Sequence, residues 1–222
     1  MKYIQQLKTC YLYGDALNWL NGEMLGDGCV LTRSPHTAYF LYGSKYLDYI
    51  NYVSDTLWSF GIFRAGTIHK QINKNYGSCV YKYESLAYCE LKSIRDLWYP
   101  SGIKDVPRST ELTPLTCRQW YIGDGCLFYS TPSSRLPSIQ LYTCAFSEST
   151  VVWLVKRLND IGIQATRQPS RNSIGISIYS VKDFLSYIGR CPVECYKYKW
   201  LEGSDAVDNT TQARRQLDKA LP

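Results

Sequence analysis

The chain has 222 residues, of which 45% are hydrophobic and 20% charged, and its formal net charge is +6. This composition is typical of a globular protein with one large core or two small ones, and the modest positive charge is compatible with a polyanionic partner. Charged residues interrupt every apolar run before the roughly 18 residues that cross a bilayer, and the N-terminus lacks the apolar core of a secretory signal. We therefore expect an intracellular protein, either of a prokaryotic cytoplasm or of an organelle, with no membrane partner.

The first hundred residues predict a helix, two strands, a helix, two strands and a closing helix. Leu17, Leu20 and Met24 recur at helical spacing and define one apolar face. Gly28 suits the end of that helix, because glycine tolerates a left-handed cap. The other elements expected here are strands at 29–33 and 38–42, a helix at 46–60, strands at 67–73 and 78–83, and a helix at about 84–98.

The second hundred residues predict the same order of elements. Segment 100–113, rich in Pro, Gly and Ser, is interpreted as a linker. Thr113 and Pro114 then make a favourable helix start, and Gly125 suits the end of this helix. Further along, we expect strands at 126–130 and 138–144, a helix at 149–161, strands at 165–171 and 174–179, and a helix at about 180–190.

Two short sequences recur about 100 residues apart. Segments 20–29 and 117–126 both end in Gly-Asp-Gly-Cys, and segment 57–62 is echoed by 158–163 in a shared pattern that ends in Gly-Ile. Ordered matches of this kind indicate a duplicated unit. The sequence therefore predicts an α+β protein of two pseudo-symmetric αββαββα repeats, each with a four-stranded antiparallel sheet. The expected divisions are a first repeat at 1–99, a linker at 100–113, a second repeat at 114–202 and a tail at 203–222.

The predicted strand regions are depleted of negative charge. Windows 28–47, 61–83, 125–147 and 161–182 contain no Asp or Glu, yet they hold several Arg and Lys residues and both histidines. Acidic residues are uncommon in strands generally, which explains part of the deficit. The accompanying basic, amide and hydroxyl side chains favour a surface that contacts nucleic-acid phosphates and bases.

The nine cysteines point away from a metal or disulfide framework. They lie at 10, 29, 79, 89, 117, 126, 144, 191 and 195, and no pair has the Cys-x-x-Cys spacing of a zinc site. Their number is odd, and the chain is expected to be intracellular. Free and mostly buried thiols are therefore the favoured interpretation.

The repeated motif resembles that of the LAGLIDADG homing endonucleases, across about residues 10–200. The nine-residue motif lies at 20–28 and again at 117–125, although Gln119 occupies the third position of the second copy. The resemblance implies that the two motif helices pack side by side, with Gly22, Gly26 and Gly123 allowing close approach. It also implies that the two sheets form a saddle in the DNA major groove, one half-site each.

The resemblance also implies how this fold would cut DNA. Asp27 and Asp124 would point at the two scissile phosphates from the ends of the motif helices, one for each strand. Together with the carbonyls of Gly26 and Gly123 they would hold Mg²⁺, and Mn²⁺ or Ca²⁺ could occupy the same sites. The suggested auxiliary residues are Lys104 and Lys199 as basic residues near the phosphates and Gln140 as a water-positioning residue. The suggested DNA contacts are Arg33, His36, Lys70, Lys74, Arg135, Arg167 and Arg171.

The predicted function is thus a metal-dependent, intron-encoded homing endonuclease that cuts both strands of a long asymmetric site as a monomer with two-fold pseudo-symmetry. The alternative is an intron RNA maturase on the same fold, possibly one that also cuts DNA. Retention of both Asp27 and Asp124 favours cleavage, because RNA binding alone requires neither. A transcription regulator with an added helix-turn-helix is less expected, since about 20 residues follow Trp200, and neither end of the chain suggests an intein.

Overall fold

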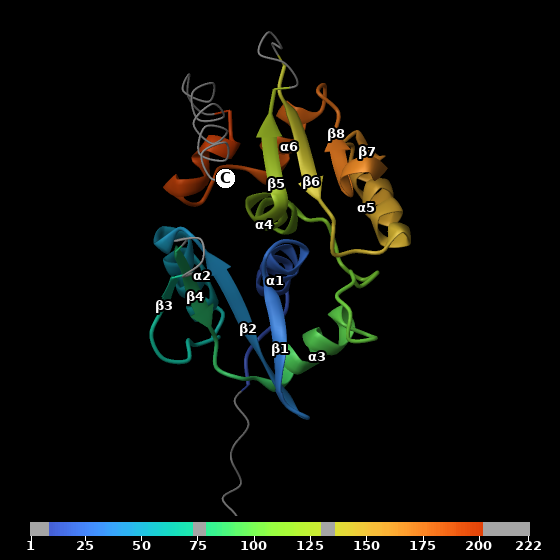
Figure 1. The fold of residues 1–222 in the computed structure, drawn as a ribbon. Coiled ribbons are helices and arrows are strands. Elements are labelled where there is room, and N and C mark those ends of the chain that lie inside the picture. The colour runs from blue at the N-terminus through green and yellow to red at the C-terminus, as the bar shows by residue number, and fades with distance from the viewer. Residues whose placement is uncertain (1–8, 73–78, 130–135, 202–222) are drawn as a thin grey trace, which may run out of the picture.

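Two four-stranded antiparallel sheets flank a central pair of helices in the computed structural model of the chain, which describes residues 9–72, 79–129 and 136–201 (Figure 1). The expected DNA contacts Lys74 and Arg135 and the tail 203–222 lie outside the described residues. Among the described residues, no helix combines the length and apolar character that spanning a bilayer requires.

The two repeats have the same order of elements and the same sheet topology, which confirms the predicted fold class. The strand orders are β1-β2-β4-β3 and β5-β6-β8-β7. The first repeat contains α1 (Asp15–Leu25), β1 (Cys29–Ser34), β2 (Thr37–Ser44), α2 (Leu47–Ser59), β3 (His69–Ile72), β4 (Cys79–Glu84) and α3 (Cys89–Trp98). The second contains α4 (Pro114–Asp124), β5 (Gly125–Phe128), β6 (Ser138–Tyr142), α5 (Glu148–Asp160), β7 (Ala165–Gln168), the 3-10 helix η1 (Pro169–Arg171), β8 (Ser173–Ile176), α6 (Val181–Ile188) and the 3-10 helix η2 (Glu194–Lys199).

Two strand boundaries differ from the sequence prediction in ways that bear on the surface. Strand β4 continues to Glu84, so the strands of the first sheet are not free of acidic residues as the windows indicated. Strand β7 ends at Gln168, and the residues expected to extend it form η1 instead. Pro169 has no N–H to donate to the ladder, which is consistent with the early end of the strand.

Each sheet buries one face against helices. In the first sheet Phe40, Tyr42 and Tyr83 are buried, and the alternation of β2 is regular from Thr37 to Ser44. In the second sheet the buried apolar set comprises Leu127, Ile139, Leu141, Ile174 and Ile176. Successive side chains of a strand point to opposite faces, so the alternate residues face away from the helices.

We call these outward surfaces the open faces. The strand pairing places Leu31, Tyr39, Leu41, Gly43, His69, Gln71, Lys82 and Glu84 on the open face of the first sheet. It places Cys126, Phe128, Ser138, Gln140, Tyr142, Thr166, Gln168, Ser173 and Gly175 on the open face of the second.

Helices α1 and α4 pack in direct backbone contact, as expected, and lie side by side at the centre of Figure 1. A Cβ on Gly22 would lie 2.5 Å from the carbonyl oxygen of Thr116 and 2.7 Å from Cβ of Gln119. A Cβ on Gly123 would lie 3.0 Å from Cα of Gly26. The glutamine in the second motif therefore does not separate the helices, because a glycine stands opposite it.

The ends of the motif helices need glycine for space rather than for a left-handed backbone. Neither Gly28 nor Gly125 has a positive φ, so the expectation of a left-handed cap is wrong. A Cβ on Gly28 would lie 2.7 Å from the carbonyl oxygen of Glu23, and a Cβ on Gly125 would overlap the ring of Tyr121. The start of α4 is as predicted, since the Thr113 side chain accepts a hydrogen bond from the amide of Thr116.

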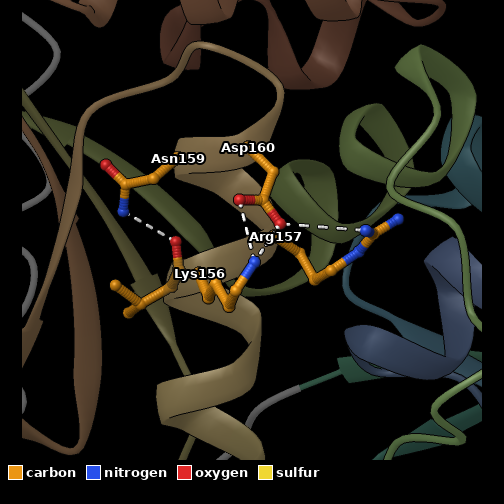
Figure 2. A network of polar contacts seen from close by, with 5 residues as sticks. Lys156, Arg157, Asn159 and Asp160 are labelled. Carbon is orange, nitrogen blue, oxygen red and sulfur yellow. Dashed lines mark hydrogen bonds and ion pairs between the residues drawn. The ribbon is translucent and has the colours of Figure 1, made fainter.

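Figure 2 shows the last turn of α5, where side chains of this helix form a network of polar contacts. Asp160 accepts from Lys156 at 2.8 Å and lies 3.8 Å from Arg157. The Asn159 amide donates to the carbonyl one turn earlier and also pairs with both backbone groups of Ala165 in the edge strand β7. Exposed ion pairs contribute about 0–1 kcal/mol each to stability. The hydrogen bonds of Asn159 to the backbone of Ala165 are therefore the contacts of this network that attach α5 to the sheet.

Candidate active site

The two aspartates of the repeated motif lie together where α1 and α4 end. Asp27 is exposed and follows α1 directly after its cap at Gly26, whereas Asp124 is half-buried and is the last residue of α4. A Cβ on Gly123 would lie 3.1 Å from the amide nitrogen of Asp27. The close helix approach therefore brings the two carboxylates to the same end of the helix pair.

Burial and like charge act on this carboxylate pair. The pKa of Asp124 is raised to about 6, first by burial and then by the neighbouring charge of Asp27, while Lys104 and Lys199 oppose the shift. The two carboxylates repel each other, and the ends of both helices carry partial negative charge. A cation bound between them would therefore be stabilised.

Each motif helix end is contacted by a lysine that lies after the last α-helix of the same half of the chain. Lys104 Nζ donates to the carbonyls of Gly26 at 3.0 Å and Gly28 at 2.9 Å. Lys199 Nζ donates to the carbonyl of Ile122 at 2.6 Å. Burial lowers the pKa of both lysines, that of Lys199 to about 8. The predicted pair Lys104 and Lys199 is thus brought to the aspartates in equivalent ways.

The donor set at these helix ends suits a hard cation only if further oxygen ligands are added. Within residues 9–72, 79–129 and 136–201, no group of three or more His, Cys, Asp and Glu side chains could hold a metal ion. The Gly26 carbonyl, an expected ligand, accepts the Lys104 hydrogen bond, although a carbonyl oxygen has a second lone pair. Two carboxylates completed by carbonyl, water and phosphate oxygens are a coordination that Mg²⁺ accepts.

Gln140, whose expected role in positioning a water stays a prediction, is held inside the second sheet. Its side chain is on the open face of the second sheet and only 2% exposed. Its amide nitrogen donates to Oε1 of Gln168 at 3.3 Å and also to Oγ of Ser173. Both amide hydrogens are therefore used inside the sheet.

The expected DNA contacts divide between the two sides of the sheets. Arg33 is exposed beside an irregularity in β1, His36 is in the following turn, and Arg171 is in η1. Lys70 pairs with Tyr81 and Arg167 with Ile174, so both leave their sheets on the helix-covered side.

Arg167 is also ion-paired at 2.6 Å with Glu148, in the first turn of α5. The structure therefore does not bring Lys70 or Arg167 to an open face. The outward residues of the first sheet include His69, Gln71 and Lys82, none of which was among the expected DNA contacts. The available signal was the alternation of β4, in which Lys82 directly precedes the buried Tyr83 and so points to the opposite face.

A buried acid beside the site also escaped the sequence analysis. Glu23 is fully buried on α1, and its Oε1 accepts a hydrogen bond from Tyr49 OH at 2.6 Å. Its pKa is raised to about 8, mainly by burial and also by the charge of Asp27 four residues later, while the hydrogen bond from Tyr49 opposes the shift. Trp120 occupies the equivalent place in the second motif, so the two halves of the site differ at this position.

Comparisons with known proteins agree on the fold. A family model described as the LAGLIDADG DNA endonuclease family matches residues 17–184. The uncharacterized protein MJ1098 of Methanocaldococcus jannaschii is 23% identical, over 92% of this chain and 86% of its own length.

Two solved structures are also similar. The homing endonuclease I-WcaI, bound to its DNA recognition sequence, has a TM-score of 0.75 and 18% identity over 90% of this chain and 91% of that one. The N-terminal LAGLIDADG domain of WhiA has a TM-score of 0.53 and 14% identity over 87% and 86%. These likenesses show a shared fold. Since the family model also spans most of the sequence, this chain belongs to the LAGLIDADG DNA endonuclease family.

Proposed function

We propose that this chain is a site-specific homing endonuclease that hydrolyses both strands of a long, asymmetric duplex DNA site with the help of a divalent metal. The observation that carries the proposal is the paired site itself. Asp27 and Asp124 lie at the ends of two helices in contact, and each helix end is contacted by one lysine, Lys104 or Lys199. The related I-WcaI, solved with its DNA recognition sequence, supports duplex DNA as the substrate.

The duplex is proposed to lie along the open faces of the two sheets, one half-site on each repeat. These surfaces lack a helical cover among the described elements, and they carry polar side chains such as Lys82, Gln71 and Gln168. A surface of this shape and chemistry suits the major groove, where base edges present distinct patterns of donors and acceptors.

The two aspartates are proposed to hold the metal and to serve one strand each. When bound, Mg²⁺, or Mn²⁺ or Ca²⁺ in its place, supplies positive charge that stabilises the negative charge developing on the phosphate oxygens. Asp124 must be ionised for this role. Burial and repulsion from the charge of Asp27 raise its pKa, and a bound cation would offset that repulsion and favour the ionised form. Lys104 and Lys199 would add positive charge beside each scissile phosphate, a role for which their buried ammonium groups are already oriented.

The proposal is tested by replacing each aspartate with its neutral isostere. We expect Asp27→Asn and Asp124→Asn each to abolish linearisation of a plasmid that carries the cognate site, by at least about 100-fold in rate, because cation binding and charge stabilisation are lost. Specific duplex binding should persist, since the open faces are unchanged. The site itself is first recovered by selecting cleaved sequences from a randomised duplex library with Mg²⁺.

Lys92→Gln is a matched control, because Lys92 is bound to Asp96 on the surface of α3 and lies outside the candidate site. The active-site assignment is wrong if either Asn variant still linearises the plasmid with Mg²⁺. A wild-type chain that binds nucleic acid tightly without ever cutting DNA would instead favour the RNA maturase alternative.

A further inference from the structure

The open faces of the two sheets differ in charge. In the first sheet the outward residues include Lys82, Glu84 and His69. In the second sheet, within the strands that the structure describes, every outward residue is neutral, and the only charged residue, Arg167, points to the helix side and pairs with Glu148. A duplex lying across both faces would therefore meet charged groups on one side and neutral amides and hydroxyls on the other.

A connected amide cluster occupies the centre of the second open face. Gln140 on β6 donates from Nε2 to Oε1 of Gln168 on β7 at 3.3 Å, and the same nitrogen donates to Oγ of Ser173 on β8. Gln140 and Ser173 are 2% and 1% exposed, whereas Gln168 is half-buried. The buried Gln140, itself bonded to Ser173, thus holds the side chain of Gln168, which is partly exposed at the surface.

The backbone below Gln168 is shaped to let its side chain lie flat on the sheet. A Cβ on Gly175 would overlap Nε2 of Gln168 and would lie 3.0 Å from its Cδ. The absence of a side chain at Gly175 leaves this space to the Gln168 amide. Among the described residues, Nε2 of Gln168 donates to no acceptor, while its Oε1 is already held by Gln140.

We propose that Gln168 is a specificity-determining residue that reads one adenine in the half-site of the second repeat, with Gln140 and Gly175 as its positioning residues. This inference rests on the proposed DNA-binding function. A glutamine amide presents a donor and an acceptor that match N7 and N6 of adenine in the major groove. The amide is held before DNA arrives, so little side-chain entropy is lost on binding. Because the cluster is neutral, it contributes base preference without adding to the salt dependence of binding.

The test is selection of bound duplexes from a library randomised over the second half-site, with Ca²⁺, followed by affinity measurements at several salt concentrations. Wild type should prefer adenine at one position, and Gln168→Ala should lose that preference by roughly 10- to 100-fold at that position only. Gln168→Glu keeps the acceptor for Gln140 but removes the donor. It should shift the preference at the same position toward cytosine, whose N4 donates to a carboxylate.

Three further variants separate base reading from general stability. Gly175→Ala should reproduce the Gln168→Ala profile, because it displaces the amide, whereas Gly43→Ala on the first open face, whose Cβ meets only Val80 Cγ1 at 3.3 Å, should leave the second half-site unchanged. Lys82→Gln should retain the adenine preference but lower the dependence of binding on salt by about one unit in the logarithmic slope.

An unchanged profile in both Gln168 variants, with wild-type unfolding temperatures, would overturn the inference, as would a changed salt slope in Gln168→Ala. The wild-type protein reports on the proposed function separately. A wild type that binds no duplex overturns both. A wild type that binds and shows the Gln168-dependent adenine preference but never cuts overturns only the cleavage proposal.

Discussion

Glu23 and the two site lysines show how burial adjusts single residues around the aspartates. Lys104 and Lys199 are held by helix-end carbonyls, which offset the cost of burying an ammonium group. Glu23 has one such partner, Tyr49, and its Oε2 has no hydrogen-bond partner among the described residues. A buried carboxyl in this setting favours its neutral form, so it adds little negative charge beside Asp27 at neutral pH.

The ionisation of Glu23 predicts a pH-dependent stability. The pKa of Glu23 is about 8 in the folded chain and 4.5 ordinarily, so the unfolded carboxyl ionises first and the folded state loses stability as pH rises from 4.5 to 8. Glu23→Gln keeps an acceptor for Tyr49 and removes the ionisation. We expect the variant to gain on the order of 2–4 kcal/mol in the free energy of unfolding at pH 8 and much less at pH 5, measured by urea unfolding. A gain that is constant over this pH range would contradict the assignment of pKa.

At the scale of elements, the contact of α1 with α4 determines where the aspartates lie. Backbone meets backbone at Gly22 and Thr116, and again at Gly26 and Gly123, without intervening side chains. The Thr116 hydroxyl donates to the carbonyl of Asn18 across the same contact at 3.1 Å. A contact made by backbone atoms cannot relax by a rotamer change, so it holds both helix ends in a single relative position.

Gly22→Ala is expected to lower the free energy of unfolding by about 1–3 kcal/mol, because the added methyl group would meet the Thr116 carbonyl oxygen at 2.5 Å and the backbone must shift. The measurement is urea unfolding monitored by tryptophan fluorescence. Gly43→Ala is the matched control, since its methyl group meets no backbone atom and only one side-chain atom, Cγ1 of Val80, at 3.3 Å. Equal midpoints for the two variants would show that the helix contact is less close than described.

At the scale of the whole molecule, one chain supplies both halves of a pseudo-symmetric site, and the halves are not equivalent. Glu23 stands where the second motif has Trp120, and the open face of the first sheet carries charge that the second lacks. The proposed 100–113 linker also contributes to the site, because Lys104 lies within it and contacts the end of α1. Different halves are what an asymmetric DNA target requires.

A further consequence is that the chain should act as a monomer. The face that α1 could offer to a second copy is already in contact with α4, since Gly22 and Gly26 lie against Thr116 and Gly123 of that helix. We expect sedimentation equilibrium to give a mass near 25.5 kDa and titration with the cognate duplex to give one chain per site. A species of twice this mass that binds DNA would contradict the proposed pseudo-dimer.

The sequence by itself determined the family, the two-repeat order of elements and the two aspartates, because a repeated motif and the periodicity of apolar residues are local properties of the chain. Only the tertiary structure decided which side of each strand is open, and it removed Lys70 and Arg167 from that side while placing Lys82 and Gln168 on it. Alternation shows which residues share a face, but the helices that cover one face come from distant parts of the chain. The same reason applies to Lys199, which meets Ile122 across 77 residues of sequence, and to Gln140 on β6, whose hydrogen bond to Gln168 on β7 crosses strand β8.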